Sequence, residues 1–159
     1  MNNVIGWIGV GSMGSRMAAN LSKGGYPLII ADKINTELAP KGAEIAHNNE
    51  ELSKKAETVI FSVPAGPDTL TIAKEFINTA DSIVKTVIDT STIGIPHAKE
   101  AFELFKTHGI EYIDAPVSGG IAGAEAGTLA VMVGCQLNSF NTVKPILDCI
   151  GKNLIHVGQ

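Results

Sequence analysis

The sequence predicts an α/β domain built on a doubly wound, mostly parallel sheet with helices on both faces. Short apolar runs alternate with stretches of helical periodicity along all 159 residues. The runs are continuous, as in Thr58-Val59-Ile60-Phe61, which is typical of parallel strands covered on both faces. A Gly-rich motif separates the first run from the first helical stretch. We therefore expect one domain over residues 1–159, with right-handed crossovers between its strands.

Each expected strand is a short run rich in Ile, Val, Leu or aromatic residues. In chain order, the strands are expected at Val4–Ile8, Leu28–Ala31, Thr58–Val63, Val84–Ile88, Tyr112–Asp114, Leu129–Val133 and Leu154–Val157. The helices are expected at Ser12–Lys23, Glu50–Lys55, Thr69–Ala80, Pro96–Lys106 and Ser139–Ile150. The remaining Gly-rich segment, Gly119–Gly127, is interpreted as a binding loop inside the domain.

The first strand runs into Gly9-x-Gly11-x-x-Gly14, directly before the first helix. In a dinucleotide-binding turn, Gly9 permits the tight turn, Gly11 lets a pyrophosphate approach the backbone, and Gly14 lets the helix pack closely. The helix N-terminus adds free N–H groups and the positive end of its dipole. The motif therefore predicts a Rossmann-type fold, with cofactor binding by Gly9, Val10, Gly11, Ser12, Met13 and Gly14. A Gly-rich turn without a ligand is the alternative.

An acidic residue follows the second strand. Asp32 lies eighteen residues after Gly14, where a carboxylate can accept hydrogen bonds from the adenosine ribose and would repel a 2′-phosphate. This spacing favours NAD over NADP. Lys33 is the next cofactor-binding candidate, and because a cation there could pair with a phosphate, it leaves NADP open as the alternative.

Two further loops follow expected strands on the same edge of the sheet, where ligands bind in such folds. The first contains Val63 and Pro64, and the second carries the hydroxyls of residues 90–92, including Thr92. Those hydroxyls could reach a nicotinamide ribose or a substrate. Turn and capping chemistry is the alternative for each loop taken alone.

A second Gly-rich segment, Asp114–Ala124, leaves its backbone bare. Ser118 supplies a hydroxyl, and Gly119 and Gly120 expose N–H groups that suit a carboxylate ligand. The same composition would equally fit a tight structural turn.

Composition argues against several function classes. The net charge is −4 without a basic stripe, so we expect no nucleic-acid partner. No apolar run reaches membrane length and no basic segment precedes the first run, so we expect a cytoplasmic protein without a membrane partner. The Cys and His residues lack the spacing of metal ligands, so we expect no metal site; they are Cys135, Cys149, His47, His97, His108 and His156.

Two segments together resemble the 3-hydroxyisobutyrate dehydrogenase family, also called the β-hydroxyacid dehydrogenases, whose broader group includes 6-phosphogluconate dehydrogenase. They are Ile8–Ala18, which holds the glycine motif, and Asp114–Gly120, which reads Asp-Ala-Pro-Val-Ser-Gly-Gly. Asp89–Ile93 and Gly127–Gly134 also resemble segments of this family. Cys135 departs from the pattern, because a second glycine is usual there.

The resemblance implies a role for each candidate. The glycine motif and Asp32 would bind NAD, Val63 and Pro64 would line its path, and Thr92 would lie near the nicotinamide. Ser118, Gly119 and Gly120 would hold the substrate carboxylate. The reaction would be the reversible oxidation of a small 3-hydroxy acid by hydride transfer to the nicotinamide.

The resemblance also implies what this chain lacks. The family carries its catalytic lysine and a nearby substrate-binding asparagine on a long helix after this kind of domain. That helix opens an all-α domain, which also forms the homo-oligomer. The chain ends at Gln159, about where the helix would begin, so we expect an NAD-binding domain with no catalytic residue of its own. The alternative is a free-standing, non-catalytic NAD-binding module that serves as a sensor or partner subunit.

Overall fold

The computed structural model describes residues 3–159, so residues 1–2 of the expected domain lie outside the described part of the chain. Within this range one sheet contains nine strands. They are β1 (Ile5–Ile8), β2 (Leu28–Ala31), β3 (Glu44–Ile45), β4 (Thr58–Phe61), β5 (Thr86–Asp89), β6 (Glu111–Asp114), β7 (Val117–Ser118), β8 (Leu129–Gly134) and β9 (Gly151–Gly158).

Six α-helices connect these strands between residues 3 and 159. They are α1 (Gly14–Lys23), α2 (Asn49–Ser53), α3 (Gly66–Asn78), α4 (Ile95–Lys106), α5 (Gly120–Ala126) and α6 (Leu137–Leu147), with one 3-10 turn at Thr36–Leu38. None of these helices is long and apolar enough to cross a membrane.

The strand order confirms the predicted doubly wound α/β fold. The sheet runs β3-β2-β1-β4-β5-β6-β8-β7, and its first six strands are mutually parallel. The order reverses between β1 and β4, and a ligand crevice is expected outside the carboxyl ends of the strands at such a point. β8 runs antiparallel to β6 and β7, and β9 pairs with β8 in parallel.

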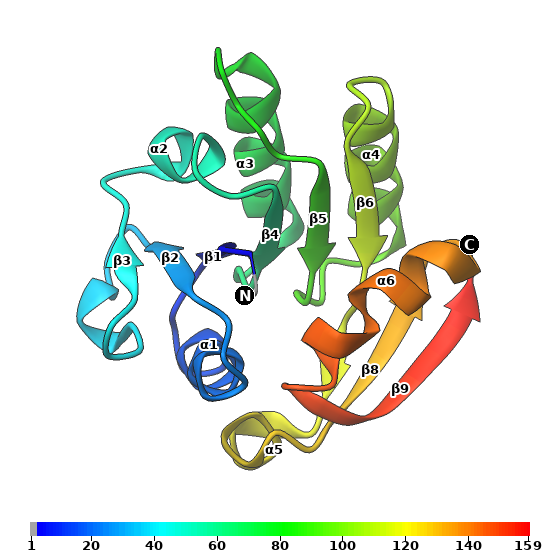
Figure 1. The fold of residues 1–159 in the computed structure, drawn as a ribbon. Coiled ribbons are helices and arrows are strands. Elements are labelled where there is room, and N and C mark those ends of the chain that lie inside the picture. The colour runs from blue at the N-terminus through cyan, green and yellow to red at the C-terminus, as the bar shows by residue number, and fades with distance from the viewer. Residues whose placement is uncertain (1–2) are drawn as a thin grey trace.

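Alternate side chains of the central strands enter two cores, one on each face of the sheet. In β1, Ile5 and Trp7 pack with α1, α5 and α6, whereas Ile8 packs with α2, α3 and α4. Figure 1 shows these two groups of helices on opposite sides of the sheet. Because the central strands are buried on both faces, their sequences are continuous apolar runs.

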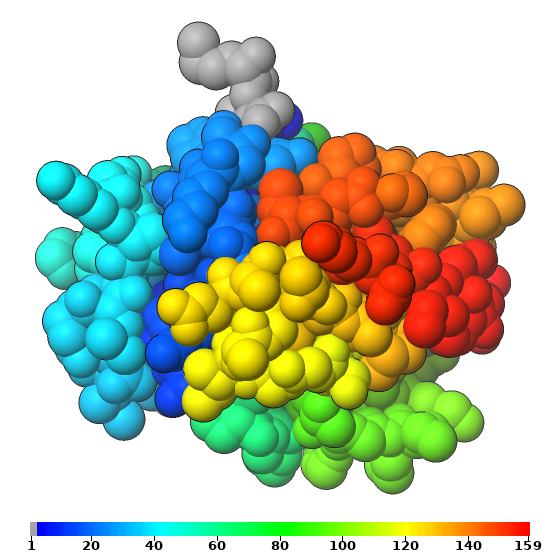
Figure 2. Space-filling model, turned by 90° about the horizontal axis from the view of Figure 1, so that it is seen from below, coloured from blue at the N-terminus to red at the C-terminus, as the bar shows by residue number. Residues whose placement is uncertain are grey.

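The prediction for the Gly-rich segment 119–127 was wrong. The segment was expected to form a binding loop, but most of it forms helix α5 between Gly119 and Gly127, which have positive φ angles of 138° and 67°. Glycine at both ends lets the chain enter and leave this short helix. The Asn20 side chain donates a 2.7 Å hydrogen bond to the Ala124 carbonyl, and Figure 2 shows the α5 region (yellow) between α1 (blue) and β9 (red).

Other differences concern strand ends and short strands. The two-residue strands β3 and β7 were not predicted, because two residues carry no usable periodicity. β9 begins at Gly151 rather than at Leu154. A Cβ at Gly151 would lie 2.6 Å from the Leu129 carbonyl oxygen, so only glycine permits the approach of β9 to β8 at this point.

Two carboxyl groups lie side by side where β5 and β6 end. Asp89 and Asp114 are partners in the parallel register, Asp89 is fully buried, and Asp114 is partly buried. Burial, together with the smaller effect of the neighbouring Asp89 carboxylate, raises the pKa of Asp114 to about 6. Folding therefore favours the protonated form of Asp114.

This shift predicts a pH-dependent effect of Asp114→Asn. The stability that protonated Asp114 contributes is present below its unfolded-state pKa and is lost as pH rises through about 6. The variant should therefore be more stable than the unmodified chain near pH 8, by about 1 kcal/mol after allowance for solvent screening of the partly exposed group. The gain should shrink toward pH 5 in urea unfolding. A gain that is equal at both pH values would contradict the raised pKa.

Candidate functional site

The loop after β1 is held by close contacts between backbone segments. Gly9 has a φ angle of 94°, and a Cβ on it would lie 2.0 Å from the Ser62 carbonyl oxygen at the end of β4. A Cβ on Gly14 would lie 2.0 Å from the Gly9 carbonyl oxygen. Gly11 differs, because no atom lies within 4 Å of its Cβ position. Two glycines of the motif therefore serve packing, and the third faces open space.

The same loop presents unpaired N–H groups at the start of α1. Within residues 3–159, the backbone N–H groups of Gly11, Ser12 and Met13 donate to no protein acceptor. The loop carbonyls are satisfied, since Gly11 O accepts from Ser15 N at 3.0 Å and Ser12 O accepts from the Arg16 side chain at 2.7 Å. The free N–H groups and the helix dipole favour an anion at this position. The open space at Gly11 leaves room for a pyrophosphate, so the loop fits the predicted dinucleotide.

Asp32 is fixed to the glycine loop by its carboxylate. Its Oδ2 accepts from Val10 N at 2.8 Å, and its Oδ1 accepts from the N–H groups of Ile34 and Asn35, each at 2.7 Å. Partial burial opposes the charged form, but these three bonds outweigh it and lower the pKa of Asp32. A carboxylate offers about four acceptor sites, so the ionised side chain retains capacity for a further donor.

A pocket of about 520 Å³ lies beside Asp32, and we call it the Asp32 pocket. It brings together several of the predicted cofactor residues, namely Gly9, Asp32, Lys33, Val63 and Pro64. Its other wall comes from the start of α2 and from α3, including Asn49, Glu50, Asp68 and Glu75. None of the residues in this second wall was predicted from the sequence to bind the cofactor.

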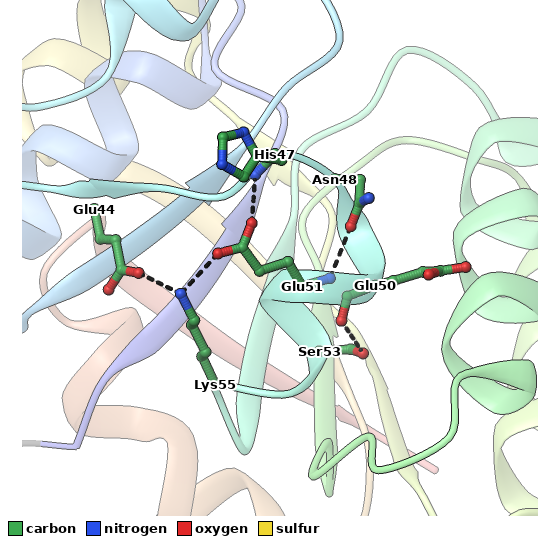
Figure 3. Close-up of polar contacts among 7 residues, drawn as sticks. All are labelled: Glu44, His47, Asn48, Glu50, Glu51, Ser53 and Lys55. Carbon is green, nitrogen blue, oxygen red and sulfur yellow. Dashed lines mark hydrogen bonds and ion pairs between the residues drawn. The ribbon is translucent and has the colours of Figure 1, made fainter.

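Hydrogen bonds preorganise the α2 wall, as Figure 3 shows. Asn48 Oδ1 accepts from Glu51 N at 2.8 Å, and the Glu51 carboxylate accepts from His47 N at 2.8 Å. Lys55 then bridges Glu51 and Glu44 at 2.7 Å and 2.6 Å. Asn48-x-x-Glu51 has the sequence pattern of a capping box, so an N-cap at Asn48 could be read from the sequence, although the Glu51 carboxylate accepts from His47 N rather than from Asn48 N. Glu50 extends away from the cluster and lines the pocket.

The loops after β4 and β5 are joined to each other by a hydrogen bond. The N–H of Val63 donates to the Ser91 hydroxyl at 2.9 Å. Thr92 follows with an exposed side chain and lines a larger pocket of about 860 Å³, together with Lys99 and Asp114. We call this the Thr92 pocket. Val63 lines the Asp32 pocket and Thr92 lines the Thr92 pocket, but the loops that carry them are joined by this hydrogen bond.

Ser118, Gly119 and Gly120 line neither of these two pockets and are exposed. Ser118 ends β7 opposite Ala130 of β8, and the two glycines have φ angles of 138° and 64°. No atom lies within 4 Å of a Cβ position on Gly120. The segment is exposed and its backbone is therefore accessible to a ligand.

Within residues 3–159, no three His, Cys, Asp or Glu side chains form a group that could hold a metal ion. Both cysteines are free thiols; Cys135 is buried and Cys149 is partly exposed. His97 packs against the start of α3, and His156 stacks on Phe140 with a centroid distance of 5.0 Å. His97 and His156 therefore both pack against other parts of the fold.

Comparison with known proteins identifies the family. The model of the NAD binding domain of 6-phosphogluconate dehydrogenase matches residues 4–158. The 3-hydroxyisobutyrate dehydrogenase of Drosophila melanogaster is 39% identical over 159 residues, which cover 97% of this chain and 48% of the relative. The 2-(hydroxymethyl)glutarate dehydrogenase of Eubacterium barkeri is 35% identical over 160 residues, which cover 98% of this chain and 53% of the relative.

A solved structure agrees with these sequence relatives. The 3-hydroxyisobutyrate dehydrogenase of Mycobacterium tuberculosis, solved with L-serine, superposes with a TM-score of 0.92 and 33% identity, over 99% of this chain and 55% of that one. The chain therefore spans about half the length of the curated relatives it matches. By sequence and by fold, this chain belongs to the family of NAD-binding domains found in 6-phosphogluconate dehydrogenase and the 3-hydroxyisobutyrate dehydrogenases.

Proposed function

We propose that this chain is the NAD-binding domain of a dehydrogenase that reversibly oxidises a small 3-hydroxy acid. The observation that carries the proposal is the set of free N–H groups at Gly11, Ser12 and Met13, next to open space and beside the Asp32 carboxylate. NAD, when bound, accepts the hydride. The chain's own residues would hold the pyrophosphate at the start of α1 and the adenosine ribose at Asp32.

We infer a preference for NAD over NADP from the charge of the Asp32 pocket. Four of the residues that line this pocket are acidic, namely Asp32, Glu50, Asp68 and Glu75. The lining contains one lysine, Lys33. A 2′-phosphate near Asp32 would add negative charge to a largely acidic wall. Exposed Lys33 can turn toward solvent, and its attraction for a phosphate would be screened there.

The Ser118 segment supports a carboxylate-bearing substrate. Ser118 is exposed and carries a hydroxyl, and Gly120 has open space on its Cβ side. A group that takes the hydroxyl proton is also required for hydride transfer. Exposed Lys99 on helix α4 borders the Thr92 pocket, outside any segment that resembles the family's catalytic motif. We therefore propose that the general acid–base lysine belongs to a further all-α domain of the whole enzyme.

The dehydrogenase activity of the relatives favours this proposal over a non-catalytic NAD sensor. Homo-oligomerisation through the all-α domain is part of the same proposal. A cytoplasmic location also stays a proposal, because the Drosophila relative is named as mitochondrial. Cell fractionation of the tagged protein would test the location directly.

Substitutions at two glycines should separate binding from folding. Gly11→Ala adds a methyl group where nothing lies within 4 Å, so stability should change by less than about 0.5 kcal/mol while NADH affinity falls about tenfold or more. Gly14→Ala drives a Cβ against the Gly9 carbonyl and should destabilise the domain by about 2 kcal/mol or more. Urea unfolding and NADH fluorescence titration measure both effects. Unchanged NADH affinity in stable Gly11→Ala would contradict the pyrophosphate assignment.

Cofactor preference should depend on the Asp32 charge. The unmodified chain should bind NADH at least about tenfold more tightly than NADPH, and Asp32→Asn should narrow that ratio. Glu37→Gln is the matched control, since it removes an exposed carboxylate that does not line the Asp32 pocket. Calorimetry with both cofactors measures the ratios. A preference for NADPH that Lys33→Gln abolishes would show that Lys33, not Asp32, determines the choice.

The chain alone should bind a small hydroxy acid without oxidising it. General acid–base assistance contributes about 10²–10⁴-fold to such a reaction, and the proposal assigns it to another domain. With NAD and 3-hydroxyisobutyrate, no NADH should form above background, with a full-length 3-hydroxyisobutyrate dehydrogenase as positive control. The amide resonances of Gly119 and Gly120 should shift on addition of the acid, and Ser118→Ala should reduce the shift. NADH formation by the chain alone would place the catalytic residues within these 159 residues.

A further inference from the structure

A buried polar cluster lies beneath the loops that follow β4 and β5. It contains Asp89 and Thr69, which are both fully buried, and Ser91, which is 6% exposed. Asp89 and Thr69 were assigned no role in cofactor binding, whereas the Ser91 hydroxyl was one of those expected to reach a nicotinamide ribose or a substrate. Polar groups are costly to bury unless they are hydrogen-bonded, so their bonds indicate what the cluster holds in place.

Asp89 joins three parts of the fold through one carboxylate. Its Oδ2 accepts from the Thr69 hydroxyl of α3 at 2.8 Å and from the Tyr112 hydroxyl of β6 at 3.1 Å. Its Oδ1 accepts from the backbone N–H of Ser91 at 2.9 Å. Burial raises the pKa of Asp89, while hydrogen bonds from Ser91, Thr69 and Tyr112 stabilise the charged form. The carboxylate therefore fixes the backbone of Ser91 against the sheet and α3.

Ser91 extends this connection to the neighbouring loop. Its hydroxyl accepts from Val63 N at 2.9 Å, at the start of the loop after β4. Thr90 supports the same junction, because its N–H and its hydroxyl donate to the Phe61 carbonyl at 2.9 Å and 2.7 Å. The loop that carries Val63 and the loop that carries Thr92 are thus held at a defined separation.

The two loops border different pockets. Val63 lines the Asp32 pocket and Thr92 lines the Thr92 pocket. A dinucleotide that extends from Asp32 toward Thr92 must contact both loops at once, whereas a mononucleotide at Asp32 needs only the first. The spacing between the loops therefore affects the two ligands differently.

We infer that Asp89 and Ser91 are positioning residues for the nicotinamide half of the cofactor, acting by fixing the Val63 and Thr92 loops relative to each other. This inference rests on the proposed dinucleotide site. Neither side chain needs to touch the cofactor, since both act through backbone groups of the loops. A purely structural role predicts equal weakening of all ligands, which distinguishes the two explanations.

The test compares NADH with AMP, which lacks the nicotinamide half. Ser91→Ala removes the acceptor for Val63 N and should lower NADH affinity about fivefold, the factor that corresponds to one hydrogen bond of average strength. AMP affinity should stay within about twofold. Asp89→Asn should lower the NADH-to-AMP affinity ratio in the same direction. Ser91→Thr keeps the hydroxyl and should restore the ratio.

Ser53→Ala is the matched control, because Ser53 is another buried serine, whose hydroxyl donates to the Glu50 carbonyl at 2.8 Å. It should leave the NADH-to-AMP ratio unchanged, whatever it does to stability in urea. An unchanged ratio in Ser91→Ala, or an equal loss of both ligands, would overturn the inference. If the unmodified chain binds neither NADH nor AMP, the dinucleotide proposal itself is wrong and the inference falls with it.

Discussion

The close approach of three backbone segments at the centre of the sheet is the constraint on which the rest of the structure depends. A side chain on Gly9 would collide with the Ser62 carbonyl, and one on Gly14 would collide with the Gly9 carbonyl. β1, β4 and α1 therefore meet with no side chain between them. This contact directs the start of α1 at the crevice where the strand order reverses, and it leaves the N–H groups of the loop unpaired.

Polar groups at the carboxyl ends of the strands then connect this crevice to the loops around it. Asp32 holds Val10 of the glycine loop, and Asp89 holds Ser91 and, through Ser91, Val63. The two carboxylates differ in environment. Three backbone donors lower the pKa of partly exposed Asp32, whereas burial raises the pKa of Asp89. The exposed carboxylate suits direct contact with a ligand, and the buried one suits support of the loops.

Helices cover the part of the sheet formed by β7, β8 and β9 less completely than the part formed by the parallel strands β1 to β6. In β8, Leu129, Val131 and Val133 are buried against α5 and α6, while Met132 and its register partner Ile155 point to the other face, where Ile155 is 49% exposed. Ser118 pairs with Ala130, which lies two residues from Met132 on the same strand and so shares its face. The proposed substrate segment therefore borders a sheet face that the described helices leave open.

Local features of the sequence determined the fold class, the order of the main elements, the close packing at the glycine motif and the family. These follow from periodicity over a few residues and from the absence of a Cβ, which are properties of short segments. Helix α5 was misread as a loop, because its glycines lower the helix propensity of the segment and because Asn20, whose side chain binds the Ala124 carbonyl of α5, lies far away in the sequence. The hydrogen bonds of Asp32 with Val10 and of Ser91 with Val63 join residues 22 and 28 positions apart. Only the tertiary structure decided these contacts, because side chains distant in sequence become neighbours only when parallel strands bring their carboxyl ends to one edge of the sheet.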